Sequence, residues 1–112
     1  MIPERIKKLA YKAALKSTHR FRLGAVIFDK KKRVLSFGWN KATKTHPRSS
    51  TPYKTIHAEL CAVIGLSREQ LRNSNIYVYR IKKNGESGLA KPCSFCHNML
   101  NEVGVKGIYY SQ

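Results

Sequence analysis

The decapeptide KPCSFCHNML at residues 91–100 places two cysteines three positions apart, directly behind Pro92. That spacing lets both thiolates turn toward one metal ion and is common in zinc sites. Residues 93–104 are predicted to form a helix that a glycine ends, so the pair lies at a helix N-terminus, where the dipole favours thiolate over thiol. Taken alone, the pair also fits a redox-active site or half of a structural zinc site. A metal site needs a further ligand from elsewhere in the chain.

His57 is the strongest candidate for that ligand because it begins a second predicted helix, HAELCAVIGL at 57–66. If the two helices lie side by side on one face of a sheet, then His57, Cys93 and Cys96 can hold a tetrahedral Zn²⁺. The fourth position stays open for water, which is the catalytic arrangement. Zinc lowers the pKa of that water and supplies hydroxide. Glu59, two residues past His57, is placed to move the proton of that water without binding the metal.

The remaining elements predict a single α/β domain over residues 1–112, with the order α-β-β-α-β-α-β. An amphipathic helix is expected at 3–16 and a last strand at 105–111. Strands separated by helices imply crossovers and a sheet that is at least partly parallel. Further strands are expected at 23–28, 33–40 and 75–81, with a long loop at 41–56 and a turn-rich connection at 82–91.

The charge of the chain is its second prominent feature, with 22 Lys and Arg against 6 Asp and Glu, a formal net charge of +16. Residues 1–56 carry +13 of this and residues 57–112 carry +3. A field of that size attracts phosphates, and polynucleotides carry the most. The sequence shows no signal-peptide pattern and no membrane-length apolar run. Three cysteines with a close pair fit metal binding in a reducing compartment. We therefore expect a soluble cytoplasmic protein.

The combination of HAE at 57–59 with PCSFC at 92–96 resembles the zinc-dependent cytidine and deoxycytidylate deaminase superfamily, whose signature is H-x-E followed by P-C-x-x-C. FGWN at 37–40 is similar to the strand end where these enzymes place a substrate-contacting asparagine, here Asn40. The resemblance implies a three-layer α/β fold with helices on both faces of the sheet, which has five strands in longer members. Because this sequence stops soon after the expected fourth strand, we expect a mixed sheet of about four strands and a minimal C-terminus here. The resemblance also implies substrate contacts from the Ala58 amide and from the strand containing Leu23 and Gly24.

The resemblance implies hydrolytic conversion of an amino-substituted base to its keto form, with zinc-bound hydroxide as the nucleophile and Glu59 as the proton shuttle. The identity of the base rests on conflicting signals. GVKGIYYS at 104–111 looks more like the deoxycytidylate and polynucleotide cytidine deaminases, whereas FGWN looks more like the tRNA adenosine deaminases. Cytosine is the leading prediction, and an adenosine deaminase acting on RNA is an alternative.

The positive charge favours single-stranded DNA or RNA as the substrate, because a target base is easiest to reach when it is already unstacked. A free pyrimidine nucleotide such as dCMP is the alternative. Two basic segments are expected to flank the pocket and contact nucleic acid, through His19, Arg20, Phe21, Arg22, Lys44, His46, Arg48 and Lys54.

Cys61 supports a rival interpretation, because it lies four residues after His57 on the same helical face. If Cys61 also bound zinc, the site would be a closed Cys3His cluster in a non-catalytic, zinc-stabilised nucleic-acid-binding module. A small buried hydrophobic role is the other interpretation of Cys61. The early end of the chain also favours association into a homodimer that covers an exposed sheet edge.

Overall fold

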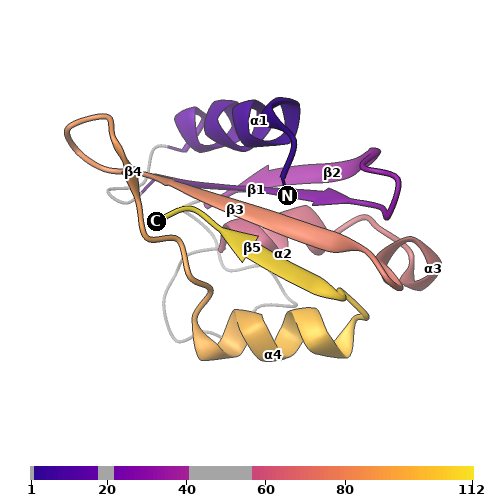
Figure 1. Cartoon of the computed structure of the whole chain (residues 1–112). Coiled ribbons are helices and arrows are strands. Elements are labelled where there is room, and N and C mark those ends of the chain that lie inside the picture. Colours follow the sequence, from indigo (N-terminus) through magenta and orange to yellow (C-terminus); the bar gives the residue numbers. More distant parts are fainter. Residues whose placement is uncertain (1, 18–21, 41–56) are drawn as a thin grey trace.

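The computed structural model describes residues 2–17, 22–40 and 57–112 of the chain. Its elements form three layers, with α1 on one face of a sheet and α2 and α4 on the other (Figure 1). None of the described helices is both long and apolar enough to cross a membrane. In chain order the elements are α1 (Glu4–Leu15), β1 (Arg22–Phe28), β2 (Val34–Trp39), α2 (Ala58–Val63), α3 (Arg68–Leu71), β3 (Asn75–Ile81), β4 (Ser87–Gly88), α4 (Ser94–Glu102) and β5 (Gly107–Tyr110).

The sheet is mixed, as predicted, and β1 and β3 lie at its centre. β1 pairs antiparallel with both β2 and β3, and β5 pairs parallel with β3 after the α4 crossover. The two-residue β4 adds a fifth strand, antiparallel to the last residues of β3. Four substantial strands with helices on both faces confirm the predicted fold class.

Alternating side chains of β1 explain why this strand is a continuous apolar run. Ala25 and Ile27 pack into the core beneath α2 and α4, whereas Val26 and Phe28 pack into a second core beneath α1. All four side chains are fully buried. A strand that is covered on both faces has no position for an exposed polar side chain, so the period-two alternation of a half-exposed strand is lost.

The first helix packs closely on β1 because Gly24 carries no side chain. Pro3 caps α1, and its buried face is formed by small and branched residues, Ile6, Ala10, Ala13 and Ala14. A Cβ atom on Gly24 would collide with the backbone carbonyl oxygen of Ala10. Gly24 therefore sets the distance between the helix and the sheet.

The region after His57 departs from the predicted long helix. α2 ends at Val63 and not at residue 66, because Gly65 adopts a left-handed conformation with φ of 99°. The short helix α3 then begins at Ser67, whose side chain and that of Gln70 each accept the other residue's backbone N–H, in a capping box. The Ser-x-x-Gln spacing was present in the sequence and would have predicted this start.

Both crossover helices begin at the same end of the sheet. Cys61 and Ala62 of α2 lie against Gly38 near the end of β2, so His57, one turn earlier, lies beyond that strand end. The segment that leads into α4 is held at the same end by a hydrogen bond from the Ala90 N–H to the Ser111 carbonyl. We call this the site end of the sheet, and we call the opposite end, with the β1–β2 turn at residues 29–33, the turn end.

Candidate zinc centre and active site

Two helix starts supply the candidate metal ligands. His57 is the N-cap of α2 and Cys93 is the N-cap of α4, and both have extended backbone dihedrals immediately before the helix. Neither side chain makes a capping hydrogen bond to the backbone of its helix. Both side chains instead take part in the contacts of a shared centre. Cys96 follows one turn into α4 and is fully buried.

The three side chains converge closely. The Nδ1 atom of His57 lies 3.1 Å from the Sγ of Cys96 and 3.7 Å from the Sγ of Cys93. All three ligand atoms lie within 4.8 Å of one another. Among the described residues, this is the only group of three or more His, Cys, Asp or Glu side chains with metal-binding spacing.

These distances fit a zinc ion. Zn–S and Zn–N bonds of about 2.3 and 2.05 Å at a tetrahedral angle place the sulfur and nitrogen atoms about 3.6 Å apart. The two observed nitrogen–sulfur distances, 3.1 and 3.7 Å, lie on either side of that value. One imidazole and two thiols are also a donor set that selects zinc over the oxygen-preferring cations.

Cys61 does not join this group. Its Cβ packs against the backbone of Gly38 on β2, at the face of α2 that contacts the sheet. His57 precedes the helix with extended dihedrals, so the usual alignment of positions four residues apart does not apply to this pair. The rival interpretation, a closed Cys3His cluster, is therefore contradicted by this geometry. Cys61 serves as a small packing residue, although it is half-buried and not fully buried as expected.

Glu59 is a buried carboxyl group beside the thiols. Its side chain is only 5% exposed, and it lies in the first turn of α2. Burial raises its pKa to about 6, against an opposing contribution from its own backbone N–H. The carboxylate lies outside the three-ligand group, yet it is near enough to Cys96 to act on that thiol electrostatically.

Burial also raises the pKa of the Cys96 thiol, and the charge of Glu59 and the neighbouring Cys93 raise it further. A buried thiol next to two acidic groups resists ionisation without a cation. A divalent ion bound by the two sulfur atoms would supply the missing positive charge. The electrostatics of the donor set thus agree with its geometry.

The residues predicted to contact substrate all lie at the site end, but they do not all face the same side of the sheet. Asn40 is buried, and its side-chain oxygen accepts the N–H of Leu23 at 2.9 Å. Ala58 is fully buried in the first turn of α2, where backbone N–H groups have no partner within the helix. Leu23 packs toward the α2 face, whereas Gly24 faces Ala10 of α1.

No sequence pattern pointed to Ser17, although this residue joins the end of α1 to the end of β2. Ser17 is buried and its hydroxyl donates to the backbone carbonyl of Asn40 at 2.9 Å. Of the predicted nucleic-acid contacts, Arg22 begins β1 and is exposed. The other predicted contacts lie outside the described residues: His19, Arg20, Phe21, Lys44, His46, Arg48 and Lys54.

A three-layer α/β fold with an imidazole and two thiols at converging helix starts defines a zinc protein of the nucleobase-deaminase class. The family profile described as "Cytidine and deoxycytidylate deaminase zinc-binding region" matches residues 2–112. The chain belongs to this family, whose members are hydrolytic zinc enzymes. No curated protein sequence gives a significant match.

Solved structures show the same fold. dCMP deaminase from the cyanophage S-TIM5 is 24% identical, with a TM-score of 0.61 over 98% of this chain and 84% of its own. The same phage enzyme in complex with dCMP and dUMP is similar at 22% identity, with a TM-score of 0.59 over 98% and 83%. Cytidine deaminase from Mycobacterium leprae matches at 22% identity, with a TM-score of 0.60 over 95% and 86%.

Proposed function

We propose that this protein hydrolyses the exocyclic amino group of cytosine to give uracil and ammonia in single-stranded DNA or RNA, with Glu59 as the proton shuttle. The observation that carries the proposal is the grouping of His57, Cys93 and Cys96 within 4.8 Å beside a buried carboxyl group. Three protein ligands leave one position of a tetrahedral centre for water, whereas structural zinc sites use four.

The chemistry divides between the ion and the carboxyl group. Zinc bound by these residues supplies Lewis acidity, which activates water at neutral pH. Glu59 accepts a proton from the water that attacks C4 of the base. It then returns protons to the ring nitrogen and to the amino group, so that the C4–N4 bond breaks and ammonia leaves. Burial of Glu59 excludes bulk water from this exchange.

The site end offers a rigid frame for the base. Asn40 is fixed by the Leu23 N–H at its side-chain oxygen and by Ser17 at its backbone carbonyl. The Ala58 N–H lies in the first turn of α2, beside His57. In this proposal, Asn40 and the amide of Ala58 orient the nucleotide, while Leu23 lines the pocket and Gly24 contributes only backbone.

The charge of the chain supports a polynucleotide substrate. A free nucleotide needs one phosphate-binding pocket, which a net charge of +16 far exceeds. A strand with many phosphates gains affinity from each cation that it contacts. A different observation favours a free nucleotide as a second candidate, since the similar phage deaminase is solved in complex with dCMP and dUMP.

The test compares substrates on one zinc-loaded preparation. A single-stranded oligonucleotide with one cytosine, the same oligonucleotide with one adenine, and free dCMP are incubated separately, and uracil, hypoxanthine and ammonia are measured. We expect conversion of the cytosine oligonucleotide at the highest kcat/KM. Conversion of dCMP alone, or of adenine in preference to cytosine, would contradict the proposed substrate.

The role of Glu59 is tested with Glu59→Ala and Glu59→Gln. Removal of a general acid–base catalyst lowers kcat by roughly 10²- to 10⁴-fold. Zinc content should stay at one ion per chain in both variants, because Glu59 lies outside the ligand group. Normal turnover in either variant would exclude Glu59 from the proton transfers.

A further inference from the structure

We infer that the edge between α1 and β2 binds the nucleotides that flank the target base in a single strand. We call the surface formed by Arg5, Lys12, Lys16, Phe37 and Trp39 the α1–β2 edge. Two features meet here, a pair of aromatic rings in which Phe37 is exposed and Trp39 is half-buried, and a row of exposed cations. The inference rests on the proposed function, because it describes how the polynucleotide substrate is held.

Phe37 and Trp39 form a stacked pair on the α1 face of the sheet. Their neighbours on β1 are Val26 and Gly24, which both face α1. The ring centroids lie 6.3 Å apart with an interplanar angle of 27°. Phe37 is 41% exposed, on a strand that within the described residues pairs only with β1. Trp39 is half-buried. An aromatic pair with one exposed ring, at successive same-face positions of an edge strand, is suited to stacking with an unpaired base.

A row of cations runs along α1 beside these rings. Positions 5, 9, 12 and 16 share one side of a helix, and three of them are the exposed side chains of Arg5, Lys12 and Lys16. The Lys16 Nζ lies 5.2 Å from the ring centroid of Trp39 and 5.7 Å from that of Phe37. The row spans about 16 Å at the helical rise of 1.5 Å per residue, room for several phosphates.

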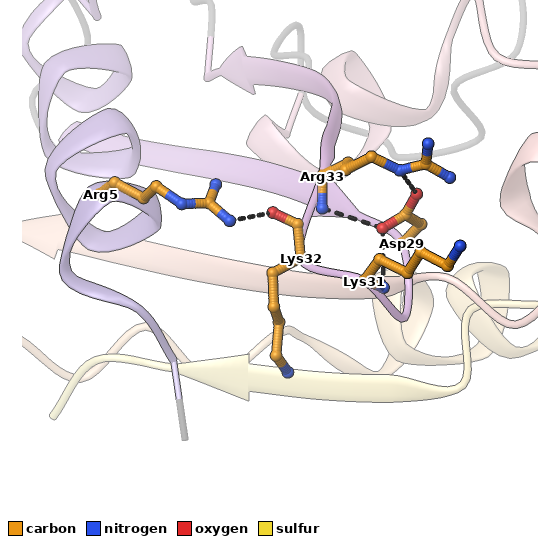
Figure 2. A network of polar contacts seen from close by, with 5 residues as sticks. All are labelled: Arg5, Asp29, Lys31, Lys32 and Arg33. Atoms are coloured by element: carbon orange, nitrogen blue, oxygen red, sulfur yellow. Dashed lines mark hydrogen bonds and ion pairs between the residues drawn. The ribbon is translucent and has the colours of Figure 1, made fainter.

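The β1–β2 turn continues the row at the turn end. Arg5 donates a hydrogen bond to the backbone carbonyl of Lys32, as Figure 2 shows. Lys32 has a left-handed backbone with φ of 67°, and its Nζ lies 5.4 Å from the Phe28 ring centroid. Because Phe28 packs beneath α1, Lys32 extends over the same face of the sheet as Arg5.

The acidic side chains of α1 and of the β1–β2 turn, Glu4 and Asp29, do not interrupt this surface. Glu4 lies on another side of α1, where its carboxylate is 4.0 Å from Lys7. Asp29 in the turn accepts the backbone N–H groups of Lys31 and Arg33 and bonds the Arg33 side chain at 2.8 Å (Figure 2). Within α1 and the β1–β2 turn, the cations of the edge therefore have no carboxylate partner, which suits a polyanion.

The α1–β2 edge leads to the candidate site. Trp39 is followed by Asn40, which the Ser17 hydroxyl ties to the end of α1 and the Leu23 N–H ties to β1. The start of α2, with His57, lies beyond the same strand end. The rings lie on the α1 face of the sheet and the zinc centre lies on the α2 and α4 face, so a nucleic-acid strand held at the edge would reach the centre around the end of β2.

The test uses Trp39 as its reporter, because it is the only tryptophan in the chain. A short thymine oligonucleotide is titrated into the zinc-loaded protein while tryptophan emission is recorded, in parallel with anisotropy of a labelled oligonucleotide. We expect tryptophan emission to be quenched saturably, with the same midpoint concentration as the anisotropy titration. An abasic oligonucleotide of equal length should bind more weakly and quench little. Binding without quenching would overturn the inference, as would equal quenching by the abasic strand.

Variants separate stacking from charge. Phe37→Ala should weaken oligonucleotide binding about fivefold or more, because each base–aromatic stack contributes strongly to single-strand affinity. Lys12→Gln should reduce the slope of log affinity against log salt by about 0.7. Matched controls at the opposite edge of the sheet are Tyr109→Ala, an aromatic that is 44% exposed on β5, and Lys106→Gln. Equal effects in variants and controls would overturn the inference.

Two further outcomes distinguish this inference from its alternatives. If Phe37→Ala converts a dimer to a monomer in sedimentation and leaves oligonucleotide affinity unchanged, the edge is an interface between copies of the chain. If duplex DNA quenches Trp39 as well as the single strand does, the single-strand assignment is wrong. Quenching needs no turnover, so a protein that binds but fails to deaminate contradicts the proposed function alone. Deamination of an oligonucleotide without quenching contradicts the inference alone.

Discussion

Two acidic side chains at opposite ends of the sheet, Asp29 and Glu59, show how differently the two regions use a carboxyl group. In the β1–β2 turn, the backbone N–H of Arg33 chiefly lowers the pKa of Asp29, with help from the Arg33 side chain and the Lys31 N–H. At the zinc centre, burial raises the pKa of Glu59 to about 6. One carboxylate is stabilised as an anion by the fold, and the other is destabilised as an anion.

The opposite pKa shifts indicate which of the two ionised carboxylates stabilises the folded protein. Asp29 arranges the turn that carries Lys31, Lys32 and Arg33, so its charge and the local structure support each other. Glu59 opposes folding when it is ionised, since a buried charge without a cation is unfavourable. A residue that weakens the metal-free protein at neutral pH is expected where chemistry requires it.

The largest effect should follow loss of a metal ligand. Cys96→Ala removes one of three donors, so we expect loss of zinc from the purified protein and loss of deaminase activity. Cys61→Ala is the matched control, because Cys61 packs against Gly38 and lies outside the ligand group. Zinc content and ammonia release measure both. Loss of zinc from Cys61→Ala would contradict the packing role assigned to that residue.

The second effect concerns stability of the metal-free protein. Because the folded-state pKa of Glu59 is raised from 4.5 to about 6, the folded state holds this proton more tightly than the unfolded chain. Stability is therefore fully present below about pH 4.5 and falls as pH rises through 6. At neutral pH the cost is on the order of 2 kcal/mol.

Glu59→Gln has no such titration, so its metal-free form should be about 2 kcal/mol more stable than the native protein at neutral pH. The two proteins should converge in acid. Urea unfolding at several pH values measures the difference. Equal stability across the range would show that the carboxyl group is better solvated than its burial indicates.

The smallest effect should come from the turn. Asp29→Asn retains the shape of the side chain and removes the charge that the Arg33 N–H stabilises, so we expect a small decrease in melting temperature at neutral pH. The folded-state pKa of Asp29 is lowered, so its stabilisation is present above 3.8 and is lost as pH falls through the lower folded value. The native protein and the variant should therefore differ at neutral pH and converge in strong acid. If Asp29→Asn changed stability more than Glu59→Gln does, the predicted order of the two carboxyl groups would be wrong.

The ligand set was predictable because its information is local. The His-x-Glu and Cys-x-x-Cys spacings each place side chains at one helix start, and the β-α-β pattern brings the two starts together. The direction of Cys61 was not predictable, because it depends on the extended dihedrals of His57 and on contact with Gly38.

Features that depend on contacts between segments distant in the chain could not be predicted from the sequence either. The two-residue β4 is too short to show a period, and it forms only because β3 offers a partner. The stacking of Phe37 on Trp39 beneath Lys16 depends on β1–β2 register and on the placement of α1. The helix α3, in contrast, had a readable capping signal at Ser67 and Gln70.

His57 and Cys93 lie 36 positions apart, and each begins a helix that connects one strand of the sheet to another. An ion held by both adds a direct link between two connections that are otherwise joined through the packing of a shared core. Amide protons of α2 and α4 should then exchange at separate rates in the metal-free protein and slow together when zinc is added. Metal occupancy in this fold is thereby a determinant of cooperativity as well as of catalysis.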